Sequence, residues 1–443
     1  MMEIEAKSTY LEKQWCTSIN WVVRIWDFEL KKEWYKDKII EGAKVWVWIY
    51  WLEKEKWETL ENTKKEIIVV IPALTGTSKL FTSWGASQWD WWANWYDEWI
   101  LNPNDNKIII SFDYFWGPEC SSPDKHNLDF YDVPAEKQVE AWKKVLQKLW
   151  VKKINTLFWG SNWWLHINHW VVDKNSKYTP DSLIAIAWSF WDIETSKDFF
   201  KVQSDVINLA KDNNIDNFEE KIINLLNSNI WPILEWLDKN SLYTIFYNSI
   251  IDEINNFKNI KDKDEKNRIT LAIARKIWFL KFVNPEFFEK FWKDKNWNEL
   301  NNLENAKQNL FNYFENETKK FEKRFSWPTL ALLCNWISKT KELTPEEFSS
   351  KISEKINLII LWIKEDNLFS SEKSKKYFSE VKEHREKWNH KWKTIFTEIS
   401  WENSKIAWHD YFLWEEWIKV INKKLLNILE NNFFWKKNII NQK

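Results

Sequence analysis

Two kinds of hydrophobic pattern alternate along most of the chain. Continuous apolar runs of about five residues, bounded by polar turn residues, are typical of strands that are buried on both faces of a sheet. Between them lie segments such as 134–150, in which apolar residues recur every three or four positions, as in an amphipathic helix. Strands that alternate with helices predict a mostly parallel α/β sheet. The expected strands are 22–25, 28–30, 43–52, 67–71, 107–112, 154–158, 183–187, 355–361 and 394–399.

The middle of the chain has a different pattern. Strand signals largely disappear after residue 191, and long charged amphipathic segments replace them up to about residue 345. We therefore divide the chain into a first core part (1–191), a helical insertion (192–345) that lies over the sheet, and a second core part (346–443). The helices expected in the insertion are 197–212, 218–228, 268–283, 285–294 and 303–325, and those expected after it are 372–382 and 415–432.

One strand-to-helix junction carries a candidate nucleophile. The apolar run 154–158 is followed by a sharp turn and a helix-like segment, 165–172, and Ser161 lies at the apex. This layout is that of the nucleophile elbow of α/β-hydrolases, whose signature is G-x-S-x-G. The glycines of the signature are needed because the turn is strained and side chains would collide with the neighbouring strand and helix. In this chain both signature positions are tryptophan, Trp159 and Trp163.

The amino-acid composition suggests a reason for this departure. The chain has 38 Trp and 5 Gly, whereas average usage of about 7% would give roughly 31 Gly. Tryptophan also stands where glycine is expected elsewhere, for example at Trp150, Trp327 and Trp362. Our hypothesis is that most of these tryptophans are UGA codons, which some bacterial lineages read as glycine. The alternative is a truly tryptophan-rich protein, and the codons at 159, 163 and 362 distinguish the two.

Charge and cysteine usage narrow the class of protein. The net charge of -1 gives no basic excess for nucleic acid and no polybasic membrane anchor. The three cysteines, Cys16, Cys120 and Cys334, are isolated, so they predict neither a zinc site nor a disulfide framework. The first residues lack the form of a signal peptide, and no apolar run is long enough to span a membrane. We expect a cytoplasmic protein with no metal site and no nucleic-acid or membrane partner.

A serine hydroxyl becomes a good nucleophile when an imidazole can take its proton and a carboxylate orients that imidazole. In α/β-hydrolases these residues follow the order Ser, then Asp or Glu, then His. After Ser161 the candidates are Asp366, just beyond the strand 355–361, and His409, between the last strand and the final helix. The oxyanion would be bound by the backbone N–H groups of Asn162 and of the loop near Leu74. Of the other histidines, His166 and His169 are expected to pack on the helix after the elbow, and His126, His384 and His390 to be solvated.

Several segments together resemble the homoserine O-acetyltransferase family. With glycine in place of tryptophan, the elbow reads as that family's G-G-S-x-G-G, and five other segments match motifs of the family. The matching segments are 159–164, 73–76 (A-L-T-G), 362–369 (G-I-x-x-D-x-L-F), 408–413 (G-H-D-x-F-L) and, in the insertion, 271–278 (L-x-x-A-R-x-I-G) and 319–325 (K-F-x-x-R-F).

The resemblance implies an α/β-hydrolase fold with a large helical lid and a ping-pong acyl transfer. Ser161 would take an acetyl group from acetyl-CoA as co-substrate, His409 would act as general base, and Asp366 would orient it. The acceptor would be a small amino-acid hydroxyl such as that of homoserine, and Arg275 would be a substrate-binding residue. The resemblance also implies that the enzyme takes part in methionine biosynthesis. The resemblance implies no bound cofactor. It does imply a homodimer that forms through the lid helices.

The chain departs from the family where basic side chains would bind the acceptor. Pro72 replaces the histidine that precedes A-L-T-G, and Ser204 stands in the first lid helix where the family has an arginine. Loss of a bidentate arginine weakens recognition of an amino-acid carboxylate. Two other functions therefore stay open: an esterase or thioesterase on the same fold, and a non-catalytic scaffold that binds through the tryptophan-rich segment 89–99.

Overall fold

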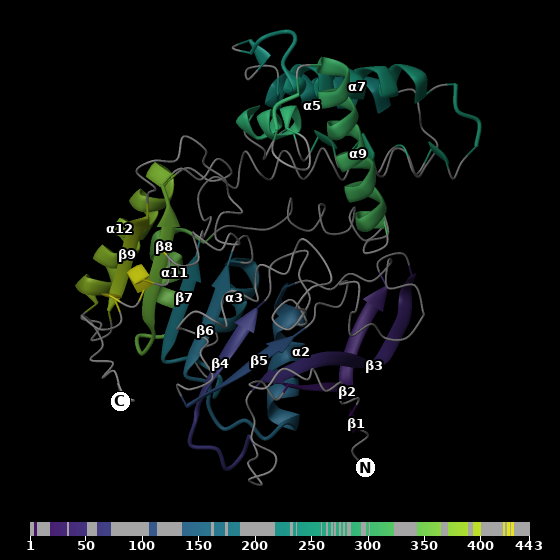
Figure 1. The fold of residues 1–443 in the computed structure, drawn as a ribbon. Helices are drawn as coiled ribbons and strands as arrows, with labels where there is room; N and C mark the ends of the chain where they lie inside the picture. The colour runs from purple at the N-terminus through teal and green to yellow at the C-terminus, as the bar shows by residue number, and fades with distance from the viewer. Residues whose placement is uncertain are drawn as a thin grey trace, which may run out of the picture.

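The computed structural model describes residues 4–6, 18–32, 35–50, 60–71, 106–112, 135–160, 164–172, 176–186, 218–230, 237–257, 285–293, 302–322, 343–364, 371–388 and 393–399, with shorter pieces between 234 and 300 and between 420 and 428. In this part of the chain nine strands form one sheet in the order β1-β2-β3-β5-β4-β6-β7-β8-β9 (Figure 1). The strands are β1 (Ile4–Ala6), β2 (Ser18–Lys32), β3 (Tyr35–Tyr50), β4 (Glu66–Ile71), β5 (Lys107–Phe112), β6 (Thr156–Gly160), β7 (Ser182–Ile186), β8 (Asn357–Ile363) and β9 (Thr394–Ile399).

The six strands from β4 to β9 are parallel, whereas β1, β2 and β3 form an antiparallel extension. The parallel strands are buried on both sides because successive side chains of a strand point to opposite faces. In β4, Ile67, Val69 and Ile71 enter one hydrophobic cluster, while Ile68 and Val70 enter the other. The continuous apolar runs of the sequence are therefore explained by two cores, one on each face.

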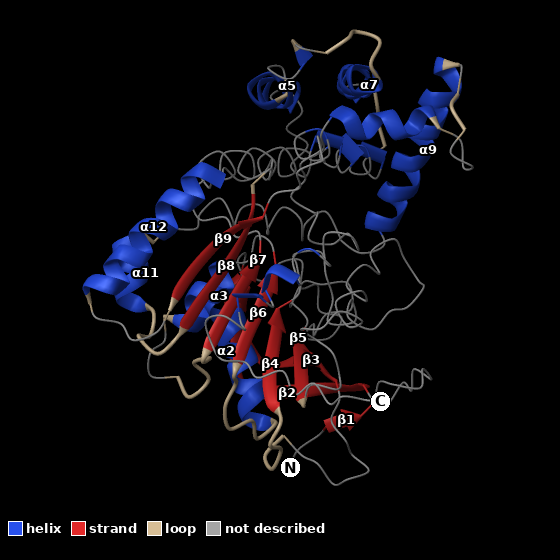
Figure 2. Ribbon diagram, turned by 60° about the vertical axis from the view of Figure 1, so that its left-hand side comes forward, coloured by secondary structure: helices blue, strands red, loops and turns tan. Residues whose placement is uncertain are grey.

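Helices cover the two faces of the sheet. The face that carries Ile67 packs against α2 (Ala135–Lys148), α3 (Trp164–Val171), α11 (Pro345–Lys351) and α12 (Ser371–Lys387), shown in blue in Figure 2. The opposite face packs against helical residues near the end of the chain, including Leu425 and Ile428. The fold is thus a parallel sheet between two helical layers.

A further group of helices lies beyond the edge at which the parallel strands end, as Figures 1 and 2 both show, and its buried residues belong to the same hydrophobic cluster as the second face of the sheet. We call it the helical unit; it comprises α5 (Phe218–Asn229), α7 (Leu242–Phe257), the 3₁₀ helix η8 (Pro285–Trp292) and α9 (Leu303–Glu322). Aromatic rings fill its interior: the ring centroids of Phe246 and Phe314 are 4.1 Å apart, and those of Tyr243 and Phe288 are 5.1 Å apart. Burial raises the pKa of Tyr243, whose hydroxyl donates to the carbonyl of Leu280 at 2.9 Å.

The expected fold class, a mostly parallel sheet flanked by helices, is confirmed. The strands expected at 107–112 and 394–399 match β5 and β9, and the helix expected at 134–150 contains α2. Some expectations were wrong in detail: β2 is one long strand rather than two, β8 extends far enough to include position 362, and α7 and α11 were not foreseen. The expected helix at 197–212 lies outside the described residues, and the insertion boundaries at 192 and 345 stay a prediction.

Candidate functional site

The carboxyl ends of the parallel strands form one aligned edge of the sheet. The register places Gly160 beside Ile186 of β7, Ile186 beside Leu361 of β8, and Leu361 beside Thr397 of β9. On the other side of β6, Ile71 of β4 lies beside residue 159. Segments that follow these strands therefore leave the sheet side by side, which is where ligands bind in open α/β sheets.

The strand-to-helix junction at the candidate nucleophile is confirmed on both of its sides. β6 ends at Gly160 and α3 begins at Trp164, so Ser161 and Asn162 belong to a three-residue connection between a buried strand and a helix. The two residues themselves lie outside the described part of the chain. The layout expected of a nucleophile elbow is present in the flanking elements, and the roles of Ser161 and Asn162 stay predictions.

The other candidate residues follow strands of the same edge. Leu74 comes three positions after the end of β4, Asp366 three positions after the end of β8, and His409 ten positions after the end of β9. All three lie outside the described residues. Neighbouring strands are about 4.8 Å apart, so the residues of β8 and β9 that are level with the end of β6 lie roughly 10 Å and 14 Å from it. Extended chain spans up to about 3.5 Å per residue, so these connections are long enough to meet near residue 161.

Arg275, the candidate substrate-binding residue, also lies outside the described part. Its neighbour Lys276 is buried in the helical unit, where its ammonium forms an ion pair with Glu253 of α7 and lies 5.7 Å from the ring centroid of Phe246. A lysine that is paired inside the unit is not available to a substrate carboxylate. The sequence did not reveal this pair, because Lys276 and Glu253 are 23 positions apart and only the tertiary structure brings them together.

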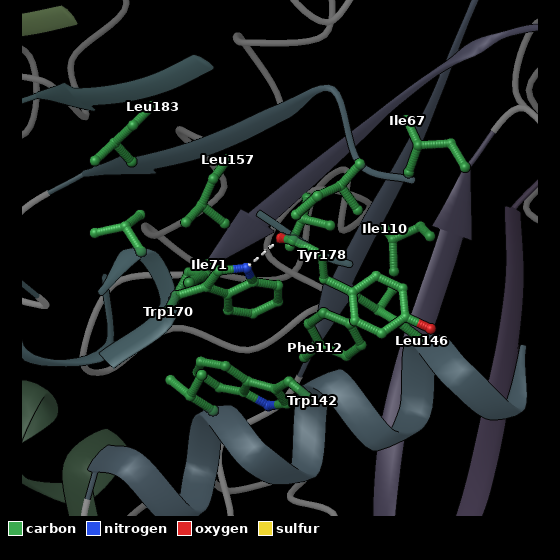
Figure 3. Packing of buried hydrophobic residues seen from close by; sticks show 14 of the residues in the cluster. Ile67, Ile71, Ile110, Phe112, Trp142, Leu146, Leu157, Trp170, Tyr178 and Leu183 are labelled. Carbon is green, nitrogen blue, oxygen red and sulfur yellow. Dashed lines mark hydrogen bonds between the residues drawn. The ribbon is translucent and has the colours of Figure 1, made fainter. Parts of the chain in front are cut away.

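A cluster of four rings holds α3 in place; we call it the ring cluster, and it consists of Phe112, Trp142, His166 and Trp170. Trp142 of α2 stacks on Phe112, the last residue of β5, with ring centroids 5.8 Å apart. The rings of His166 and Trp170, one helical turn apart on α3, lie 5.3 Å and 6.3 Å from Trp142. All four side chains are fully buried, and Figure 3 shows Phe112, Trp142 and Trp170 grouped between helix and sheet.

Two hydrogen bonds fix the end of α3. The indole N–H of Trp170 donates to the carbonyl of Tyr178 at 2.9 Å, drawn as a dashed line in Figure 3. Lys143 of α2 donates to the carbonyl of Trp170 at 3.3 Å, and a cation near the last turn also complements the helix dipole. Together with the ring cluster, these contacts hold α3 against α2 and the sheet, and so help to determine where the connection that holds Ser161 ends.

The two histidines of α3 differ, contrary to the expectation that both pack. His166 is fully buried, whereas His169 is exposed. Burial is the main cause that lowers the pKa of His166 well below its usual value of 6.5, and the neighbouring charge of His169 lowers that pKa further. The imidazole of His166 is therefore neutral in the folded protein near neutral pH.

We expect the stability of the protein to fall as the pH is lowered below about 6.5, partly through His166. Below pH 6.5 the unfolded chain binds a proton at this imidazole, while the folded state keeps it neutral. The free energy of unfolding therefore falls by up to about 1.4 kcal/mol for each unit by which the pH is lowered, until the pKa of the folded state is reached. Urea unfolding at pH 7.5, 6.5 and 5.5 measures the slope. His166→Phe, which keeps a ring against Trp142, should reduce the slope, and His169→Gln, which removes only the smaller of the two causes, should retain most of it. An unchanged slope in His166→Phe would contradict the assignment.

The strand order, the aligned carboxyl edge and the two helical layers define the α/β-hydrolase fold. Solved structures share it. The crystal structure of esterase E22 aligns with a TM-score of 0.59 at 14% identity, over 93% of this chain and 100% of the esterase. Homoserine O-acetyltransferase from Staphylococcus aureus aligns with a TM-score of 0.56 at 15% identity, over 96% and 98% of the two chains. An acetylester hydrolase from Corynebacterium glutamicum has a TM-score of 0.56 at 13% identity, over 92% and 96%.

Sequence comparison gives no closer assignment. No model of a known protein family matches the chain, and no curated protein matches it. At identities of 13–15% the structural likeness establishes the fold and leaves the reaction open. Among the described helices, none combines the length and the apolar character that crossing a membrane requires.

Proposed function

We propose that the protein is an acyltransferase of the homoserine O-acetyltransferase type, which moves an acetyl group from acetyl-CoA to an amino-acid hydroxyl through an acyl-enzyme on Ser161. The observation that carries the proposal is the junction of β6 and α3 around Ser161, at the same edge from which the chain leaves β8 towards Asp366 and β9 towards His409. The order of these residues along the chain is that of an α/β-hydrolase triad.

In the first half-reaction, His409 takes the proton of Ser161 while the serine oxygen attacks the thioester carbonyl. The backbone N–H groups of Leu74 and Asn162 stabilise the oxyanion, and Asp366 holds the imidazolium that forms. The carbon–sulfur bond then breaks, and CoA leaves as a thiol with the proton from His409. In the second half-reaction, His409 removes a proton from the acceptor hydroxyl, whose oxygen attacks the acyl-enzyme. The bond between the acyl carbon and the serine oxygen then breaks, and His409 returns the proton to Ser161 as the ester leaves.

Transfer to an acceptor requires that water be kept from the acyl-enzyme. We assign this role to the helical unit, because it lies beyond the carboxyl edge of the sheet (Figure 1). In this proposal the unit acts as a lid, Arg275 contributes to acceptor binding, and lid helices pair two copies of the chain. We further propose that the enzyme is cytoplasmic and takes part in methionine biosynthesis.

A second candidate function is hydrolysis of an acyl ester or thioester on the same triad. It is favoured by the similarity of the fold to esterase E22 and to the acetylester hydrolase, which is as high as that to the acetyltransferase. The absence of a basic residue at Pro72 and Ser204 points in the same direction, because an esterase need not bind an amino-acid carboxylate.

We expect release of CoA from acetyl-CoA to depend on the acceptor. Adding L-homoserine should increase the rate at least about tenfold, which corresponds to roughly 1.4 kcal/mol of preference for the acceptor over water. Free thiol is measured with and without L-homoserine, and with glycerol as a hydroxyl control. Release at the same rate in all three would contradict the transferase and favour the hydrolase. No release from acetyl-CoA, with cleavage of a short-chain ester, would also favour the hydrolase.

A further inference from the structure

Helix α2 ends in a well-formed Schellman motif. The N–H of Val151 donates to the carbonyl of Leu146 at 3.0 Å, and the N–H of Trp150 donates to the carbonyl of Gln147 at 3.1 Å. These are the two hydrogen bonds that define the motif, and they place Trp150 at the first position after the helix cap. Val151 and Leu146 are both buried in the same hydrophobic cluster, as is usual for the apolar contact that accompanies the motif.

This position requires the left-handed backbone conformation, and Trp150 adopts it, with φ of 60°. Among the described residues only Asn106, with φ of 57°, shares a positive φ without being glycine. Asparagine tolerates this region because its short side chain bonds locally, whereas a residue with a large side chain is disfavoured there. Glycine, which has no Cβ, is the residue that normally occupies the position.

Most of the side chain of Trp150 is in contact with solvent, so packing offsets little of this cost. It is 62% exposed, more than any other large hydrophobic side chain among the described residues. The hydrogen bonds of the motif are made by its backbone alone. The indole therefore contributes little to the fold, while its Cβ disfavours the conformation that the fold needs.

Two other tryptophans show the opposite behaviour. Trp142 and Trp170 are fully buried in the ring cluster, and the N–H of Trp170 bonds to the Tyr178 carbonyl. Glycine at either position would remove a large ring from the core. Trp362 in β8 is intermediate: it is fully buried, but its indole N–H has no hydrogen-bond partner among the described residues. A buried donor without an acceptor costs stability, but removal of a fully buried indole costs at least as much, so position 362 is assigned to neither class.

We infer that the natural protein has glycine at position 150, and that the tryptophans of the sequence divide into two classes: codons read as glycine, of which 150 is one, and true tryptophans, of which 142 and 170 are two. The inference rests on the backbone at 150 and on the packing at 142 and 170, independently of any enzymatic activity. It bears on the proposed function, because the same reading at 159 and 163 gives the G-x-S-x-G signature around Ser161.

The decisive test is the gene and the protein from the source organism. We expect UGA at codon 150 and UGG at codons 142 and 170. In mass spectrometry, the peptide that contains residue 150 should have the mass calculated with glycine at that position. A UGG codon at 150, or a tryptophan-containing peptide mass, would overturn the inference. Either result leaves the acyl-transfer proposal to be decided separately by its own assay.

A series of variants, made in a protein that carries tryptophan at position 150, tests whether the left-handed backbone there disfavours a residue with a Cβ. Trp150→Gly should raise the ratio of folded to unfolded protein about fivefold to thirtyfold, measured by urea unfolding. The reason is that glycine has no Cβ, whose close approach to the following carbonyl oxygen disfavours the left-handed conformation. Trp150→Ala is the matched control: it removes the same indole but keeps the Cβ, so its gain should be clearly smaller. Equal effects of the two substitutions would overturn the conformational argument. Trp170→Gly should lower the ratio, and an unchanged ratio would overturn the division into two classes.

Discussion

Replacement of Ser161 by alanine is expected to abolish formation of the acyl-enzyme and to lower the overall rate at least about ten-thousandfold. The hydroxyl oxygen of Ser161 forms the covalent bond to the acyl group in our proposal, and alanine has no atom that can form this bond. The measurement is incubation with a radiolabelled acetyl donor, followed by quantification of protein-bound label and of CoA release. Residual turnover would come from binding and oxyanion stabilisation alone.

The control for this experiment is Ser379→Ala. Ser379 lies on the exposed side of α12, where its hydroxyl donates to the carbonyl of Lys375 at 2.8 Å. Its loss should leave labelling and turnover unchanged. Persistent labelling in Ser161→Ala would show that the nucleophile is a different residue, and the proposed roles of Asp366 and His409 would then have no basis. Parallel unfolding curves confirm that both variants fold.

The largest effect on stability is expected for Trp170→Ala. This substitution removes a fully buried indole from the ring cluster and leaves the carbonyl of Tyr178 without its donor. Truncation of a buried tryptophan costs about 3–5 kcal/mol, and an unsatisfied buried acceptor adds about 1–3 kcal/mol. Because typical domains are stable by only about 5–15 kcal/mol, the variant should unfold at a much lower urea concentration.

Trp170→Phe and Trp388→Ala separate the contributions. Trp170→Phe keeps an aromatic ring near Trp142 but loses the N–H, so it should cost less than Trp170→Ala. Trp388 follows α12, is 42% exposed and contacts His384 with ring centroids 6.1 Å apart. Its truncation should change the free energy of unfolding by no more than about 0.5 kcal/mol, as is usual for surface positions. A cost for Trp170→Ala as small as that for Trp388→Ala would contradict the role of the ring cluster.

Prediction from the sequence worked best where a local pattern has one physical cause. The apolar residues of the segment 134–150 lie on one helical face, and Val139, Val145 and Leu146 are indeed buried against the sheet. Prediction was weaker for the long paired strands β2 and β3, because polar residues interrupt their apolar runs and the pairing continues through them, with a register shift between Ile25 and Glu29. It also missed α7, whose buried residues face the aromatic interior of the helical unit.

The amino-acid sequence by itself determined the alternation of buried strands and helices, the place of Ser161 between a strand and a helix, and the order of Ser161, Asp366 and His409 along the chain. Local hydrophobic periodicity and turn chemistry are sufficient for these inferences, because each depends on neighbouring residues only. The tertiary structure decided which distant strands are neighbours: β7 and β8, which are separated by the whole helical unit in sequence, pair residue by residue from Ser182 with Asn357 onwards. It also distinguished Trp150 from Trp170, since the same residue type is exposed in a left-handed turn in one case and buried with a bonded N–H in the other. Strand pairing and burial depend on contacts between segments far apart in the chain, and no local pattern specifies them.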